Sequence, residues 1–243
     1  MIDLEGNAVI KVWFKQEPTD SLRVQVISQI ETHQTNPFNY LLEPWATKLP
    51  IDYPSSLSVQ LQPYLVGQRS GYAAAIDPVA IQLAQEVADQ VDGNITSFLS
   101  ALNQKIYKSC QQIIRETGEP LSPGVTWAEK SGSCRDFTVL FMEVCRAIGL
   151  AARFVSGYQE GDPDSSDRHL HAWAEVYLPG AGWRGFDPTH GSAVADRHIA
   201  LVASIFPRYA APISGSFSQG SGAQSEMTYQ LLIQGLGVDN LNK

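Results

Sequence analysis

The apolar periodicity of residues 134–149 constrains the fold of this chain more than any other feature. Large apolar side chains recur there at the three- and four-residue spacing of one helix face: Phe137, Leu140, Phe141, Val144 and Ile148. Gly149 follows the last of them and is typical of a helix end. The pattern predicts an amphipathic helix that begins at Cys134 and buries one face.

After this helix the period changes from helical to alternating. The segments ARFVSGY, LHAWAEVYL and GWRGFD are short and rich in aromatic and β-branched residues. A loop, QEGDPDSSDR, and a tight turn at 179–182 separate them, so they predict antiparallel strands. Two helices are expected upstream, one opening at Asp77-Pro78 and one running from Asn94 towards Gly118. Together these elements indicate an α+β fold.

The first third of the chain predicts a separate β region. A turn at 5–7 precedes an extended run, and residues 22–26 alternate apolar and polar side chains as in a half-buried strand. Residues 36–66 are rich in proline and predict an irregular connector. We therefore expect an N-terminal β region with its connector at 1–66 and a core at 67–243, with further strands at 198–206 and 227–234.

Composition and charge exclude several functions. The formal net charge is −8 and the pI is near 5.1, and Lys and Arg do not cluster, so nucleic acid is not an expected partner. No run approaches the roughly 18–20 apolar residues of a membrane helix. The N-terminus lacks the pattern of a secretory signal, so we expect no membrane partner and a cytoplasmic location. Three cysteines are too few for a disulfide framework, and reduced thiols are expected.

Cys134 stands where a helix favours negative charge. The helix dipole and free backbone N–H groups favour a thiolate there, and the same amides could hold a developing oxyanion. This placement is weak evidence alone, but two partners follow it. If the strands on either side of the turn at 179–182 pair, His171 and Asp187 come into rough register. A thiol, an imidazole and a carboxylate brought together form a triad for covalent acyl transfer.

The motifs around these residues resemble the transglutaminase-like superfamily, in its bacterial cysteine protease branch. The resemblance is carried by GSCRDFTVLFMEVCRAIGLAARFVSGY, HAWAEVYLPGAGWRGFDPTHG and DRHIAL, and it is dense over roughly residues 120–202. It implies a papain-like core, in which the helix bearing the cysteine packs on an antiparallel sheet. It also implies a preceding β-sandwich-like region, which we expect to be small here and either truncated or unusually short.

The resemblance assigns roles to individual residues. Cys134 matches the nucleophile, His171 the general base and acid, and Asp187 the carboxylate that orients the imidazole. Asp136 is expected to hold the helix start or a nearby loop. Two departures concern the shaping of the substrate site: His190 stands where the family often has asparagine, and SIFPRY stands in place of a Gly-Arg-Asp-Tyr stretch.

Trp127, Trp173 and His169 are candidates for the substrate cleft. Trp173 shares a strand face with His171, and core packing is its alternative role. Trp127 precedes Cys134 closely, and packing of the preceding helical turn is its alternative. His169 is expected at a loop edge near the cleft. His169 and His171 form a His-x-His pair, but no carboxylate or cysteine pair with the usual metal spacing accompanies it, so neither a metal nor a cofactor is expected.

These expectations lead to one function and two alternatives. The expected function is thiol-dependent acyl transfer on amide bonds of a protein or peptide, through a thioester that water resolves. The sequence holds no calcium loop of the Asp-x-Asp-x-Asp-Gly type, which favours hydrolysis slightly. A transglutaminase that passes the acyl group to an amine stays open, as does a non-catalytic module that binds a peptide or protein. Self-association through an unpaired edge of the N-terminal sheet is also predicted.

Overall fold

The computed structural model describes residues 1–14, 21–69, 72–115, 117–160, 170–216 and 226–234. Its helices and strands, in chain order, are η1 (Pro44–Ala46), α1 (Ser55–Leu65), β1 (Gly67–Arg69), β2 (Tyr72–Ala74), α2 (Pro78–Gln90), α3 (Ile95–Ser109), β3 (Gln111–Gln112), α4 (Pro123–Glu129), β4 (Ser131–Gly132), α5 (Cys134–Ala147), β5 (Ala152–Gln159), β6 (Leu170–Leu178), β7 (Gly182–Asp187), β8 (Ser192–Ala193), β9 (His198–Ser204) and η2 (Pro207–Ala210).

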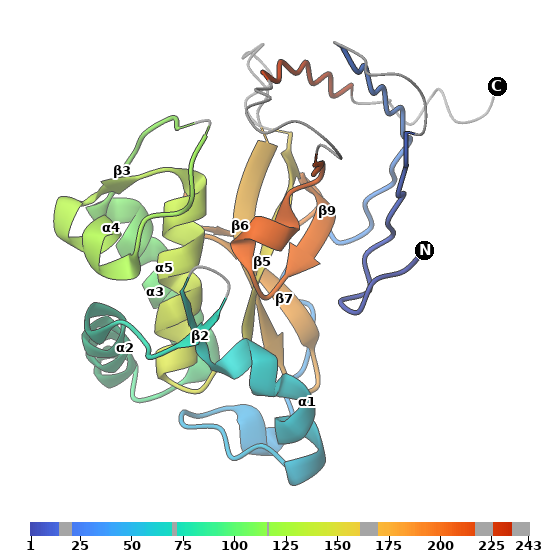
Figure 1. The fold of residues 1–243 in the computed structure, drawn as a ribbon. Coiled ribbons are helices and arrows are strands. Elements are labelled where there is room, and N and C mark those ends of the chain that lie inside the picture. The colour runs from blue at the N-terminus through green and yellow to red at the C-terminus, as the bar shows by residue number, and fades with distance from the viewer. Residues whose placement is uncertain (15–20, 70–71, 116, 161–169, 217–225, 235–243) are drawn as a thin grey trace.

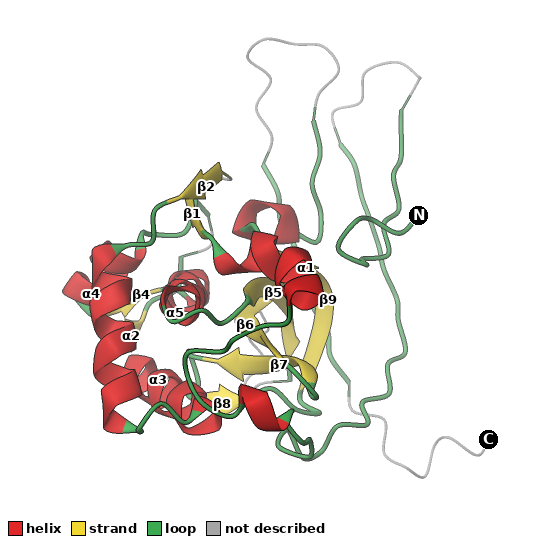
Figure 2. Ribbon diagram, turned by 90° about the horizontal axis from the view of Figure 1, so that it is seen from below, coloured by secondary structure: helices red, strands yellow, loops and turns green. Residues whose placement is uncertain are grey.

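The core has three layers. Helix α5 lies between a five-stranded sheet on one side and helices α2, α3 and α4 on the other, and Figure 2 shows it end-on in that position. This mixed architecture is the α+β, papain-like core that the sequence predicts. Among the described residues, no helix combines the length and apolar character needed to cross a membrane.

The five-stranded sheet has the order β8-β7-β6-β5-β9, and all its pairings are antiparallel. β6 and β7 form the predicted hairpin, with Leu178 opposite Gly182 beside the turn. His171 is the second residue of β6 and Asp187 the last of β7, so both lie at the open end of the hairpin. Helix α5 begins at that same end of the sheet (Figure 1).

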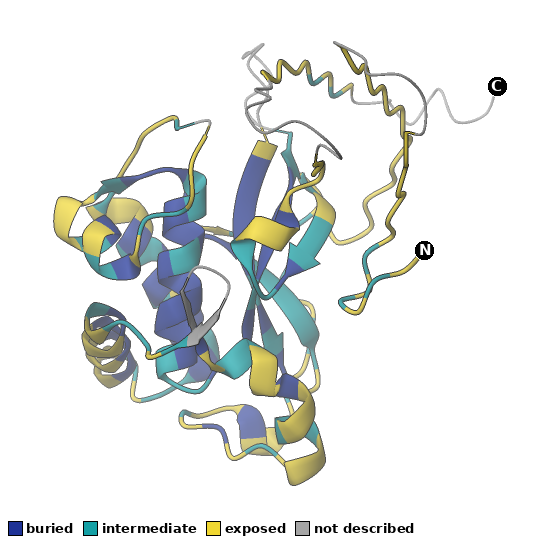
Figure 3. Cartoon of the chain, viewed as in Figure 1, coloured by how far each residue is buried: buried dark blue, intermediate teal, exposed yellow. Residues whose placement is uncertain are grey.

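Helix α5 forms the centre of the core, and it begins at Cys134 as predicted. Its large apolar side chains are buried, and the ring of Phe141 stacks on Phe186 of β7 with centroids 5.7 Å apart. Burial of each such side chain contributes about 1.5–3 kcal/mol. Figure 3 shows the buried residues gathered on α5 and the central strands. The helix is therefore fixed along most of its length, and so is the cysteine at its start.

The upstream helices begin where the sequence predicts, but one ends earlier. Asp77 caps α2 by accepting from Val79 N at 2.9 Å, and Asn94 caps α3 by accepting from Ser97 N at 2.9 Å. Helix α3 ends at Ser109, not near Gly118, because Gln111–Gln112 leave the helix to pair with β4. The sequence did not predict α1, which forms inside the expected connector and buries Leu61.

The strands expected in the N-terminal third are absent. Described residues 1–14 and 21–43 contain no strand, and their one β-bridge joins Ile2 to Ala8. Val24 and Val26 are 58% and 77% exposed. Alternating side chains stabilise a strand only when a neighbouring strand and an apolar surface cover one face, and neither is present here. Residues 227–234 form no strand for the same reason. The division near residue 66 and the self-association stay predictions.

The predicted turn at 5–7 does form, and it docks on the sheet. Gly6 adopts a φ of +88°, and Asp3 Oδ1 accepts from Asn7 N at 2.8 Å. The Asn7 side chain exchanges two hydrogen bonds with the backbone of Ala203 in β9, of 2.8 and 2.9 Å. The turn therefore occupies part of the outer edge of β9, which is an edge strand of the sheet.

Candidate active site

Cys134 is the first residue of α5, and Ser133 is its N-cap. The chain just before it is fixed by the short parallel ladder of β3 and β4, which Ile113 extends by donating its N–H to Gly132 O at 2.9 Å. The thiol residue is partly exposed. A helix leaves its first N–H groups without partners inside the helix, so hydrogen-bond donors lie beside the sulfur. This environment suits a reactive thiolate.

Asp136 anchors the start of α5 and a neighbouring loop, as predicted. Its carboxylate is fully buried. Oδ2 accepts from the backbone N and from Oγ of Ser133, both at 2.7 Å. Oδ1 accepts from Leu121 N at 2.7 Å and from Arg115 Nη2 at 2.5 Å. One side chain thus fixes both the residue before the thiol and the loop beside it.

His171 and Asp187 meet at the open end of the hairpin. Nε2 of His171 lies 2.7 Å from Oδ2 of Asp187, and both side chains are buried. Since Nε2 faces the carboxylate, Nδ1 is the ring nitrogen left for Cys134, which lies close enough to raise the pKa of His171. The structure therefore brings together the three residues that the sequence predicts as a triad.

Two further histidines contact the same carboxylate oxygen. His190 Nδ1 lies 2.9 Å from Asp187 Oδ2, and His198 Nε2 lies 3.1 Å from it. The other oxygen, Oδ1, accepts from the backbone N–H groups of Thr189 and His190 at 3.0 and 3.3 Å. Sequence reasoning assigned no role to His198, although it lies within the DRHIAL motif. Its contact depends on the position of β9 in the sheet, which no local pattern reveals.

These contacts set the charge state of the pair. Burial alone would lower the pKa of His171, but hydrogen bonds to Asp187 and Cys134 raise it to about 10. Burial alone would raise the pKa of Asp187, but hydrogen bonds from His171, His190 and His198 hold it well below its usual value. The site therefore favours an imidazolium beside a carboxylate, and an imidazolium is the charge that stabilises a neighbouring thiolate.

His171, Asp187 and His190 also form the one group of three possible metal ligands among the described residues, with ligand atoms within 4.8 Å of one another. Their spacing suits hydrogen bonds better than a metal ion. If two nitrogens and one oxygen all bound a tetrahedral zinc ion, each nitrogen would lie about 3.3 Å from the oxygen. Here the His171 and His190 nitrogens lie only 2.7 and 2.9 Å from Asp187 Oδ2. We interpret the group as a hydrogen-bonded cluster.

The predicted cleft residues differ in where they lie. Trp173 is 1% exposed, with its ring packed edge-on against His198 at 5.3 Å between centroids, so it lies under the site and contributes no open wall. This matches its alternative role in core packing. Trp127 is partly exposed on α4, where its ring is covered by the ammonium group of Lys130. His169 lies outside the described residues.

Neither of the other two cysteines has the surroundings of Cys134. Cys145 is buried in the core on α5, where burial raises the pKa of its thiol. Cys110 is half-buried just after α3, and burial raises the pKa of its thiol too. Both environments favour the neutral thiol, which is a poor nucleophile.

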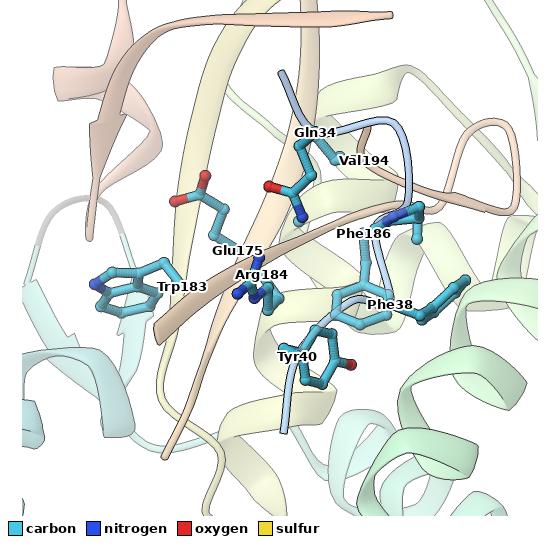
Figure 4. Close-up of a pocket in the computed structure, with 11 residues that line it drawn as sticks. Gln34, Phe38, Tyr40, Glu175, Trp183, Arg184, Phe186 and Val194 are labelled. Atoms are coloured by element: carbon cyan, nitrogen blue, oxygen red, sulfur yellow. The ribbon is translucent and has the colours of Figure 1, made fainter. Parts of the chain in front are cut away.

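A small pocket of about 80 Å³ lies between the β6–β7 hairpin and residues 34–40, where the connector begins (Figure 4). Glu175 and Arg184 reach it from the hairpin, while Phe38 and Tyr40 reach it from the connector. None of the triad residues lines this pocket. It is therefore separate from the cluster at the start of α5.

Fold and site together define a class of protein: a papain-like core in which a central helix begins with a cysteine and a β-hairpin brings a histidine and an aspartate to it. Residues 81–188 match the family model of the transglutaminase-like superfamily. The chain therefore carries a domain of that superfamily, and the resemblance seen in its motifs is confirmed.

Three similar proteins place the chain in context. An uncharacterized Mycobacterium tuberculosis protein is 28% identical in an alignment of 219 residues that covers 81% of this chain. This chain spans about 65% of the length of that relative. The crystal structure of a proposed cysteine protease from Cytophaga hutchinsonii has a TM-score of 0.52 at 24% identity, covering 68% of this chain and 53% of that chain, and supports the fold. The periplasmic domain of TgpA from Pseudomonas aeruginosa is 26% identical over 49% of this chain and 45% of that domain, with a TM-score of 0.40.

The expected cytoplasmic location is wrong. The TgpA structures similar to this chain are of a periplasmic domain. The expectation rested on the absence of an apolar run long enough for a membrane helix and of a recognisable signal at the N-terminus. Neither property determines the compartment of a catalytic domain, because the domain folds by the same core packing on either side of a membrane.

Proposed function

We propose that the protein is a thiol-dependent enzyme that hydrolyses amide bonds of a protein or peptide substrate through a thioester on Cys134. The observation that carries the proposal is the 2.7 Å contact between His171 Nε2 and Asp187 Oδ2, which leaves Nδ1 of the same ring for Cys134. The family match of residues 81–188 supports it. A non-catalytic binding module would have no need of a buried histidine–aspartate pair beside a cysteine.

The reaction starts from the ion pair in which the proton of the Cys134 thiol has passed to Nδ1 of His171. The thiolate sulfur then attacks the carbonyl carbon of the amide, and the carbonyl oxygen becomes an oxyanion. Backbone N–H groups at the start of α5 are the donors nearest to that charge. Asp187 stabilises the imidazolium throughout, since it stays ionised among its hydrogen-bond donors.

In the second step the tetrahedral intermediate collapses. The C–N bond breaks, and the proton on His171 Nδ1 goes to the leaving amine, so the acyl group is left as a thioester on Cys134. Neutral His171 then takes a proton from water, and the resulting hydroxide attacks the thioester carbon. The C–S bond breaks, the sulfur regains the proton, and a carboxylic acid is released.

We propose water as the acceptor because it needs no binding site of its own. A transglutaminase must also bind an amine and keep water away from the thioester. The same chemistry on Cys134 serves both outcomes, so the acceptor is a question for experiment.

The test is incubation with glutamine-containing peptides and proteins, with and without a primary amine. Ammonia release, peptide cleavage and amine incorporation are followed by mass spectrometry. Hydrolysis predicts a deamidated or cleaved product in both conditions. An amine adduct that outweighs the hydrolysed product would replace water with the amine in this proposal.

Matched thiol variants give the control. Cys134→Ala should abolish every product, whereas Cys145→Ala removes a buried thiol of the same helix and should leave turnover within about twofold. If Cys134→Ala keeps wild-type turnover, the proposed nucleophile is wrong.

A further inference from the structure

His198 lies under the triad, on a strand that does not contribute to it. Its side chain is 5% exposed, and its Nε2 lies 3.1 Å from Asp187 Oδ2. On its other side the ring packs edge-on against Trp173. His198 is the first residue of β9 and lies opposite Gln159 of β5. Strands β5 and β6 separate β9 from β7 in the sheet, so His198 reaches Asp187 from the opposite direction to the rest of β7.

The contact fixes which nitrogen of His198 carries the proton. An ionised carboxylate only accepts hydrogen bonds, so Nε2 must donate. Nδ1 is buried and has no hydrogen-bond partner among the described residues. A neutral ring leaves Nδ1 as a bare acceptor, whereas a protonated ring would bury an unsatisfied charged N–H at greater cost. The geometry therefore favours the neutral Nε2–H tautomer.

Close packing of β9 against β5 fixes the position of His198. At Gly157 of β5, an added Cβ would lie 2.1 Å from the carbonyl oxygen of Ile199 and 2.5 Å from a ring carbon of Trp173. Only glycine lets β9 approach β5 and Trp173 this closely. Because Ile199 follows His198 directly, this approach sets the distance of the His198 ring from Asp187.

We propose that His198 is a positioning residue: its Nε2–H holds the Asp187 carboxylate in the orientation that turns His171 towards Cys134. This inference rests on the proposed function and deepens it, since it adds a residue that acts through Asp187 and touches no substrate. His190 is a second donor to the same oxygen, but its side chain is 41% exposed, so water can replace it. Water has little access to His198.

The titratable groups acting on this carboxylate are His171 of β6, His190 of the following turn and His198 of β9, and Cys134 of α5 acts on His171. Each N–H donor favours the ionised form of Asp187. A site that lacks the donor of His198 should therefore let Asp187 take up a proton at a less acid pH. Once neutral, Asp187 no longer stabilises the imidazolium, and the thiolate is lost with it.

Two substitutions separate the donor from the ring. His198→Leu keeps an apolar side chain but removes the N–H, whereas His198→Gln keeps an N–H near the position of Nε2. The rate of alkylation of Cys134 by iodoacetamide is measured from about pH 2 to 9, next to kcat and KM for the best peptide substrate. Wild type and His171→Ala are measured alongside.

For His198→Leu we expect the acid limb of the alkylation profile to move up by about one pH unit, and kcat to fall about tenfold with KM within twofold. His198→Gln should keep the acid limb of wild type and most of kcat. A purely structural role for the ring predicts the reverse order, because leucine packs against Trp173 better than glutamine. Equal profiles in wild type and His198→Leu, or an equal loss in both variants, would overturn the inference.

The same data distinguish this inference from the proposed function. If wild-type Cys134 titrates like a free thiol and His171→Ala changes nothing, the proposed function fails and the inference fails with it. If His171→Ala abolishes the low-pH reactivity but His198→Leu does not change it, only the inference fails. Should His198→Leu not fold, imidazole ¹⁵N spectra of the wild-type protein decide: an Nε2–H signal for His198 supports the inference, and an Nδ1–H signal overturns it.

Discussion

Ser133 donates two hydrogen bonds to a single oxygen of Asp136, one from its backbone N–H and one from its hydroxyl, and both are 2.7 Å long. The acceptor lies in the first turn of α5, and the donor is the residue immediately before Cys134. The backbone that presents the thiol is therefore tied to the helix that follows it. The same carboxylate holds the loop that contains Leu121, so helix start and loop form one unit.

We predict that Asp136→Asn lowers the free energy of unfolding by about 3 kcal/mol, because an amide N–H replaces one of the oxygens that accept buried hydrogen bonds. Urea unfolding measures this change. Glu86→Gln is the matched control, since Glu86 forms a surface ion pair with Lys105 at 2.8 Å and should lose only about 0.5 kcal/mol. Equal losses in the two variants would contradict the assignment of Asp136.

The pH dependence of the unfolding free energy should reveal the charge state of His171. Its pKa is raised to about 10 in the folded protein from an ordinary 6.5. Its contribution is therefore fully present below about pH 6.5 and is lost as the pH rises towards about 10, by at most about 1.4 kcal/mol per pH unit. The difference in unfolding free energy between wild type and His171→Gln should shrink over that range. A difference independent of pH would show that the imidazole is not charged in the folded state.

Asp187 should affect the stability of the protein at acid pH. Its folded pKa is held well below the usual value, so its contribution is present above about pH 4 and is lost as the pH falls further. Acid unfolding of Asp187→Asn should therefore depend less steeply on pH below 4 than that of wild type. The exposed acid Asp92 offers the control, and Asp92→Asn should leave the acid slope almost unchanged. Parallel acid slopes for wild type and Asp187→Asn would count against the carboxylate cluster.

The three thiols should differ sharply in reactivity. In native protein at pH 7.5, iodoacetamide should modify Cys134 at least about 100-fold faster than Cys145, because the buried thiol is neutral and covered. Peptide mapping after timed quenching gives the three rates, and unfolding in urea should make them equal. Modification of Cys145 at the rate of Cys134 without unfolding would contradict the core position of that residue.

Gly157→Ala should disrupt the packing of β9 against β5. The new methyl group would overlap the carbonyl of Ile199 and the ring of Trp173, and we expect a loss of about 3 kcal/mol in unfolding free energy together with most of the activity. Gly215→Ala is the matched control, since nothing lies within 4 Å of its added Cβ. A stable, fully active Gly157→Ala protein would show that β9 can shift without moving His198.

The candidate triad could be predicted from sequence because its signals are local. The helix start at Cys134 follows from apolar spacing, and the register of His171 with Asp187 follows from one tight turn. The strands predicted after the turn at 5–7 and at residues 22–26 did not form, because alternation records only which side chains would share a face. It does not record whether a partner strand exists to cover that face, and the exposed Val24 and Val26 show that here none does.

The sequence by itself determined the central helix, the hairpin and the three residues they bring together, because periodicity and turn chemistry act over a few neighbouring residues. Only the tertiary structure decided that His198 and His190 share the carboxylate of Asp187 with His171, and that Trp173 lies beneath them. Those contacts depend on the order of strands in the sheet and on the close approach at Gly157. Strand order is set by the packing of the whole core, which a local pattern does not contain.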